Sequence, residues 1–196
     1  PPVSAAADHV QQHFFNGAPL TAAACLARYA ALTNEISRGM VGESARWGDA
    51  QREPPVMHSN WINAVSGVMN NYLPNRSAVV LQQLRNRGLY PGVGAPVFSQ
   101  RGGEVPDGYN LELSHTNASG VIFFTLDGGD PRLPGGAVHP NAQSYSAPIV
   151  VNAPVFVRAR VRTGTNWSAI VEGILNPPQD LSRLLVTEIM FNPPDD

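Results

Sequence analysis

The sequence predicts an α+β protein built from two units, a helical segment followed by an all-β antiparallel sandwich. Three observations lead to this class. Apolar residues recur at three- and four-residue steps over residues 1–90. Short β-branched and aromatic runs separated by turn residues follow over residues 97–176. A Gly- and Pro-rich connector at 91–96 lies between them and is the expected boundary.

Composition limits both size and partners. The chain has 196 residues, 43% apolar and 14% charged, which is enough for a core but long for one small sandwich. Its net charge of −2 does not favour nucleic acid or a membrane surface as partner. No apolar run reaches membrane-spanning length. The chain contains no lysine, which excludes Schiff-base and P-loop lysine chemistry.

The helical segment contains four expected helices. The first covers residues 4–15 and closes at Asn16–Gly17. Thr21 is the expected N-cap of a long helix through Trp47. Ser59 is expected to cap a third helix that Leu73–Pro74 ends, and a fourth spans 75–86. Their apolar stripes are broad, so we expect an exposed hydrophobic patch on residues 1–90.

The charged and nucleophilic residues of this segment are expected to have structural roles rather than to form a site. His9 and His13 are one helical turn apart, but no third ligand accompanies them, so no metal is predicted. Cys25 is alone and is expected to be a small buried helical residue. Glu43, Arg46 and Asp49 are expected to form a capped, salt-bridged helix end rather than a site.

The β segment is expected to hold strands of alternating character. In the strand expected at 109–114, Tyr109, Leu111 and Leu113 should face the hydrophobic core. The other expected strands cover 97–100, 121–126, 149–151, 154–162 and 168–175. Asn176–Asp180 opens a second linker, 177–183, and the strand-like residues of 184–196 lack a sheet of their own.

The strand over 154–162 carries an arginine on every second position. Val155, Val157, Ala159 and Val161 should enter the core. Arg158, Arg160 and Arg162 should then lie on the exposed face, where Glu112 could pair with one of them. This row is either a solvated strand face that resists aggregation or a strip that binds an anion or an acidic glycan.

Two further groups have alternative roles. Asp127, Gly128, Asp130 and Arg132 belong to a turn in which the carboxylates are expected to cap the backbone, with calcium binding as the alternative. Trp167 and Tyr145 would form a glycan-stacking surface if their rings are exposed. The alternative for Trp167 is packing over the end of the sandwich.

Residues Val121–Arg132 resemble the "YTxDGxDPR" signature of the Ig-like domain at the C-terminus of chitobiases and β-hexosaminidases. Phe123–Phe124 replaces the usual pair containing Tyr, and Gly129 stands where Ser is common. Tyr145–Ile149 and Asn166–Ala169 fit the same family's later motifs. The resemblance implies an Ig- or fibronectin-like sandwich at 97–176.

Two other resemblances concern the ends of the chain. Residues Gln12–Thr21, Glu43–Asp49, Trp61, Arg76–Arg85 and Gly88–Pro91 resemble the C-terminal helices of the spore-coat protein H (CotH) family of atypical kinases. That family's nucleotide, metal and catalytic residues come mostly from earlier sequence, and none is matched here. Leu184–Pro193 resembles the opening strand of a lamin-tail-like domain. Together they imply a piece of a large secreted or cell-surface bacterial multidomain protein.

The leading hypothesis is therefore a non-catalytic spacer or interaction region without a cofactor, whose partners are the flanking domains of its parent protein. A polysaccharide or a cell-surface protein is the other partner considered. One alternative is a carbohydrate-binding module that uses Trp167, Tyr145 and the arginine row. The other is the C-terminal part of an atypical CotH-type kinase, with Glu43, Arg46 and Asp49 completing a site built elsewhere.

Overall fold

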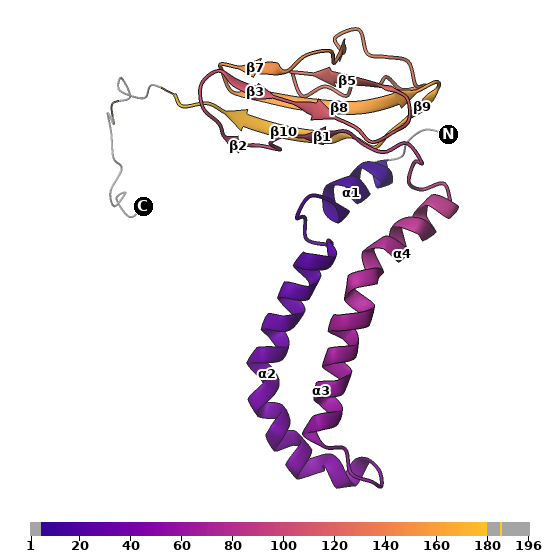
Figure 1. The fold of residues 1–196 in the computed structure, drawn as a ribbon, viewed down its shortest axis with the longest axis vertical. Helices are drawn as coiled ribbons and strands as arrows, with labels where there is room; N and C mark the ends of the chain where they lie inside the picture. Colours follow the sequence, from indigo (N-terminus) through magenta and orange to yellow (C-terminus); the bar gives the residue numbers. More distant parts are fainter. Residues whose placement is uncertain (1–4, 180–184, 186–196) are drawn as a thin grey trace, which may run out of the picture.

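The protein is of the α+β class, as the sequence predicts, with helices first and strands after them (Figure 1). The structure is a computed structural model that describes residues 5–179 and 185. The expected strand at 184–196 and most of the linker at 177–183 lie outside the described residues.

Helix α1 covers Ala5–Phe14 and ends where the sequence predicts. Asn16 and Gly17 both adopt left-handed backbone angles, with φ of 57° and 76°. Glycine, and to a lesser degree asparagine, tolerates this conformation, so the pair stops the helix and turns the chain.

Helix α2 runs from Ala22 to Gln51. Thr21 is its N-cap, as predicted, because its Oγ1 accepts a hydrogen bond from the N–H of Ala24 at 3.4 Å. The helix extends four residues past Trp47, the predicted end. At its far end the carbonyl of Gly48 accepts a hydrogen bond from the N–H of Val56 at 3.0 Å, which begins the return of the chain.

The expected break at Leu73–Pro74 was wrong. Helix α3 (His58–Gly67) continues through a π-helical turn, η1 (Val68–Tyr72), into helix α4 (Leu73–Asn86). Pro74 has no N–H, and the wider turn before it shifts the pairing so that the N–H of Leu73 bonds to the carbonyl of Val68. The expected cap at Ser59 was also wrong, because Met57 occupies the N-cap position.

Helices α2 and α3–η1–α4 lie side by side as an antiparallel pair that projects from the strands (Figure 1). We call residues 22–86 the helical hairpin. Its second arm ends at Gly88, whose φ of 67° allows the N–H of Leu89 to bond back to the carbonyl of Leu84 at 2.9 Å.

The strands form one large sheet and two small ones in what we call the β region, residues 97–176. The large sheet has the order β2–β10–β8–β5–β6, with β9 paired to β8, and the small sheets are β1–β4 and β3–β7. The bounds are β1 Val97–Phe98, β2 Gly103–Glu104, β3 Tyr109–Leu111, β4 Leu113–Ser114, β5 Val121–Thr125, β6 Gln143–Ser144, β7 Ile149–Val151, β8 Val155–Thr163, β9 Asn166–Trp167 and β10 Val171–Asn176.

All three sheets contribute to one hydrophobic core. Val157, Ala159 and Val161 of β8 have no exposed surface, which confirms the predicted inward face of that strand. Leu111 and Leu113 are also buried, as predicted. The pairing departs from the expected antiparallel pattern at one edge, because β2 runs parallel to β10.

Helix α1 lies between the hairpin and the large sheet (Figure 1). The sequence assigned α1 to the helical segment alone. Its contacts with β10 attach it to the β region as well, so it is the element through which the two parts meet.

Candidate functional site

The junction between the helices and the β region is centred on Arg160 of β8. Its guanidinium group forms two hydrogen bonds to the carboxylate of Asp8 in α1, at 2.9 and 2.8 Å. It forms two more to Asp130, both at 2.7 Å, and Nη1 also donates to the carbonyl of Ser168. We call Asp8, Arg160 and Asp130 the Arg160 clamp.

The clamp overturns the expectation that Arg160 is solvated. Its side chain is only 2% exposed, because α1 covers the outer face of the sheet at this point. A buried guanidinium is costly unless it is paired, and two carboxylates with a backbone carbonyl satisfy this one. Asp8 lies 152 residues away in the sequence, so no local pattern on β8 indicates it.

Ionisation of the clamp follows from its contacts. Burial alone would raise the pKa of Asp130, but the hydrogen bonds and charge of Arg160 outweigh it and lower that pKa. Burial would lower the pKa of Arg160, and its bonds to Asp130 and Asp8 raise it instead. The carboxylate of Asp130 therefore stays ionised to lower pH in the folded protein than in the unfolded chain.

A small apolar cluster reinforces the junction next to the clamp. Tyr90, Ala7 and Ala169 are buried together, and Val10, Phe15, Leu81 and Leu84 pack around them. The hydroxyl of Tyr90 hydrogen-bonds to the buried amide oxygen of Gln11 in α1. Burial raises the pKa of Tyr90 to about 12. The expected boundary after residue 90 thus passes through a packed cluster.

The other two arginines of β8 have separate partners. Arg158 pairs with Glu172 at 2.9 Å and lies over the ring of Phe156. The suggested pair between Glu112 and one of the three arginines is not among the ion pairs of the described residues. The guanidinium carbon of Arg162 lies 5.5 Å from the centre of the Trp167 ring. Each arginine of the row therefore has contacts of its own, and the central one is buried.

The structure does not bring Trp167 and Tyr145 onto one surface. Trp167 is 3% exposed, packs against Phe123 and donates its Nε1–H to the carbonyl of Gly136 at 2.8 Å. Tyr145 is half-buried against Phe124, the next residue of β5. Successive residues of a strand point to opposite faces, so the two rings flank different faces of the sheet. The flat glycan-stacking surface expected from these residues is not formed.

The acidic turn after β5 is held by its own side chains. Asp127 Oδ1 accepts a hydrogen bond from the N–H of Gly129 at 2.8 Å. Asp130 Oδ1 accepts one from the N–H of Arg132 at 2.9 Å, in addition to its bonds to Arg160. Gly128 has a φ of 75°, and a Cβ there would lie 2.5 Å from the ring of Phe156. Local caps and close packing account for these residues.

The helical hairpin has a different surface. Across residues 20–50 and 52–89, Gly48 is the only buried residue. Large apolar side chains are exposed along the hairpin, as the broad stripes of the sequence predict: Leu32, Ile36, Val41, Trp47, Met57, Ile62, Tyr72 and Val79. Leu20 and Leu89, which flank the hairpin in the sequence, are exposed as well. A shallow hollow of about 490 Å³ lies between α2 and the second arm, lined in part by Trp61 of α3 and Met69 of η1.

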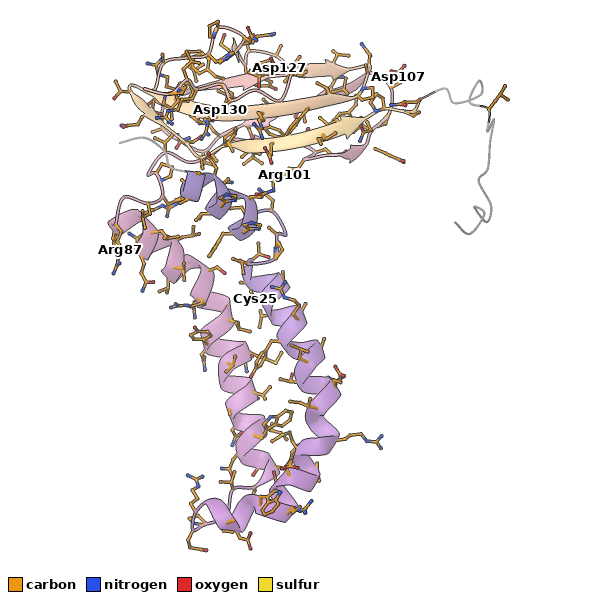
Figure 2. All side chains as sticks on the ribbon, turned by 180° about the vertical axis from the view of Figure 1, so that it is seen from behind. Cys25, Arg87, Arg101, Asp107, Asp127 and Asp130 are labelled. Carbon is orange, nitrogen blue, oxygen red and sulfur yellow. The ribbon has the colours of Figure 1, made fainter. Side chains whose placement is uncertain are left out.

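The remaining candidates of the helical part do not converge. Glu43, Arg46 and Asp49 are all exposed, and the ion pairs found within residues 5–179 involve Arg158 and Arg160 instead, so the expected salt-bridged helix end is not formed. Arg46 lies over the ring of Trp47. Cys25, labelled in Figure 2, is half-buried rather than buried.

The described residues contain neither a metal-binding cluster nor a helix that could cross a membrane. His9 and His13 stack on each other, with ring centres 6.3 Å apart, and no group of three or more metal-ligating side chains occurs there. None of the described helices combines the length and the hydropathy that crossing a bilayer requires.

Comparison with known proteins gives no further assignment. No protein-family model, no curated protein and no solved structure matches this chain.

Proposed function

We propose that this chain is a non-catalytic spacer and interaction region of a larger secreted or cell-surface bacterial protein. In this proposal the β region is an Ig-like sandwich, and the helical hairpin docks against a flanking domain of the same polypeptide. The resemblances to chitobiase-type Ig-like domains and to the end of CotH-type kinases support the setting. The contacts of the described residues support separate roles for the hairpin, as a docking surface, and for the β region, as its support.

The observation that carries the proposal is the unburied state of the hairpin. Long helices in proteins owe most of their stability to the burial of an apolar face. Here arms of 30 residues (α2) and of residues 58–86 run together, yet Gly48 is the only buried residue in 20–50 and 52–89. Exposed apolar side chains of this extent mark a surface that another protein covers.

The base of the hairpin is fixed, which suits a spacer. The Arg160 clamp and the Tyr90 cluster tie α1 to the large sheet and to the end of α4. A partner that covers the hairpin would therefore be held at a set orientation to the β region. Flexible linkers cannot transmit orientation in this way.

A flanking domain is the partner that best fits the distribution of apolar residues. They extend along both arms, from Leu32 on α2 to Val79 on α4, rather than forming one compact patch. Covering them needs a surface as long as the hairpin, which a neighbouring domain of the same chain offers at high effective concentration.

Site-specific photo-crosslinking in the full natural polypeptide tests the proposal. A benzophenone amino acid replaces Ile36 on α2 or, as a matched control, Ile174 on β10. Both side chains are 52% exposed, so reactivity differs only through what covers them. We expect crosslinked peptides from position 36 that map to another domain of the same polypeptide, and few from position 174.

Two results would contradict the proposal. One is an equal low yield at both positions. The other is crosslinking of position 36 to a second copy, identified by mixing isotopically labelled and unlabelled protein, which would make the hairpin a dimer interface instead.

A further inference from the structure

A cleft of about 970 Å³ opens beside the junction and is separate from the apolar surface of the hairpin. The end of α4, the connector at 88–93 and Ala7 of α1 line it from the helical side of the chain. Arg132, Gly135, Gly136 and residues 165–167 line it from the β region. Arg87, labelled in Figure 2, marks the end of α4 next to the β region. The volume lies in the range of small-molecule sites.

The charge of the cleft is positive. Arg85 of α4 and Arg132 of the loop both line it, and no carboxylate occurs among the described residues that do. The side chain of Arg85 stacks on Tyr90, with its guanidinium carbon 5.4 Å from the centre of the Tyr90 ring. Two guanidinium groups facing a recess favour an oxyanion, because their N–H groups match its oxygens in pairs.

Arg132, in the lining of the cleft, has an unused donor. Its Nε is enclosed, and no acceptor among the described residues lies within hydrogen-bonding distance of it. An unmet buried donor is costly, and among the described residues this nitrogen shares that state with nitrogens of His58, Arg101, His115 and Arg162; Arg132 is the one of these five residues that lines the cleft. A Cβ added at Gly136 would lie 4.0 Å from this nitrogen, in ordinary van der Waals contact with it, so Gly136 and Arg132 are neighbours in the lining.

The other lining residues suit a ligand with both polar and apolar faces. Leu89, Pro91 and Val93 supply apolar surface, and Thr165 and Asn166 supply side chains that hydrogen-bond. Four glycines, at 88, 92, 135 and 136, leave peptide groups accessible. Trp167 contributes packed surface only, because its N–H is already bonded to Gly136. A pyranose ring with hydroxyl groups matches this mixture better than a bare inorganic anion does.

We propose that this cleft binds a sugar residue that carries a carboxylate, such as a uronic acid within an acidic polysaccharide. Arg132 and Arg85 bind the carboxylate, and the Thr165–Asn166 edge contacts the ring hydroxyls. The site is independent of the hairpin's partner. It also differs from the exposed arginine row and aromatic surface that the sequence suggests.

Calorimetric titration of the chain with a short oligogalacturonate tests the site. Arg132→Ala and Arg85→Ala should each weaken binding by about tenfold or more, because each removes charge-assisted hydrogen bonds. Arg87→Ala is the matched control, since Arg87 is exposed, carries the same charge and does not line the cleft. It should bind like the wild type. Thermal melting checks that each variant is folded.

The competing arms use neutral chito-oligosaccharide and inorganic phosphate. Both should bind at least about tenfold more weakly than oligogalacturonate, because each lacks either the charge or the ring. Failure of oligogalacturonate to bind would overturn the proposal. So would equal losses in Arg87→Ala and Arg132→Ala, which indicate diffuse charge attraction, or phosphate binding as tight as the sugar's.

Discussion

The β region buries its apolar side chains in a core of its own, whereas the helical hairpin leaves many of its apolar side chains exposed. In the β region, short strands from three sheets direct side chains such as Leu111, Val157 and Leu175 into one core with no exposed surface. In the hairpin, two long regular arms leave Ile36 and Trp47 about half exposed. Regular secondary structure therefore does not show whether a segment is stable without a partner, because stability depends on whether its apolar face is covered.

The largest contrast should come from the same substitution made in each region. Leu111→Ala removes a side chain with 0% exposure and should lower the free energy of unfolding by about 2–5 kcal/mol. Leu32→Ala removes one that is 62% exposed and should cost no more than about 0.5 kcal/mol. Urea unfolding followed by circular dichroism measures both. Similar losses would mean that Leu32 is buried in solution.

The next largest contrast in stability should come from substitutions at the junction between the two regions. Arg160→Ala leaves the carboxylates of Asp8 and Asp130 without their cation and should cost about 3 kcal/mol. Arg158→Ala, two residues away, removes a pair whose members are each about one-third exposed and should cost at most about 1 kcal/mol. Denaturant titration of the two variants compares them. A loss at Arg158 as large as that at Arg160 would show that the clamp does not join the parts.

Glycine substitutions should change stability in opposite directions in the two regions. A Cβ at Gly173 of β10 would lie 2.3 Å from the carbonyl oxygen of Arg101, so Gly173→Ala should destabilise the protein by about 1–3 kcal/mol. A Cβ at Gly39 of α2 meets nothing within 4 Å, and Gly39→Ala should stabilise it by about 0.5–1 kcal/mol. Thermal melts give both signs. Destabilisation by Gly39→Ala would indicate close packing on that face of the hairpin.

Acid should weaken the joint through Asp130. Its pKa is lowered in the folded state, so its contribution is complete above the unfolded value of about 3.9. The contribution is lost as pH falls from there through the folded value. The stability of the wild type should therefore fall more steeply below about pH 4 than that of Asp130→Asn. Parallel curves for the two proteins in that range would contradict this role.

Local patterns of the sequence predict most elements of both regions. Thr21, the Asn16–Gly17 stop and the alternation along β8 depend on nearest neighbours, and each behaves as predicted. Pro74 did not end its helix, because a π turn rearranges the hydrogen bonds before it. The alternation along β8 assigned both faces correctly, but Arg160 on the outer face is buried under α1, whereas Arg158 and Arg162 remain partly exposed.

The junction depends on contacts that no local pattern contains. Arg160 is buried because Asp8 and Asp130 approach it from α1 and from the turn after β5. Tyr90 is buried because Gln11 and Ala169 meet it from distant parts of the chain. Alternation predicts which face of a strand a residue lies on, but what covers that face depends on the tertiary fold.

Hydrogen exchange read by mass spectrometry tests the central contrast most directly, because it reports opening free energies along the whole chain at once. The amides of β5, β8 and β10 should exchange slowest, through global unfolding, while those of α2 and α3–η1–α4 exchange much faster through local opening. Hairpin amides as well protected as those of β8 would contradict the account, because the hairpin would then be stable without a partner.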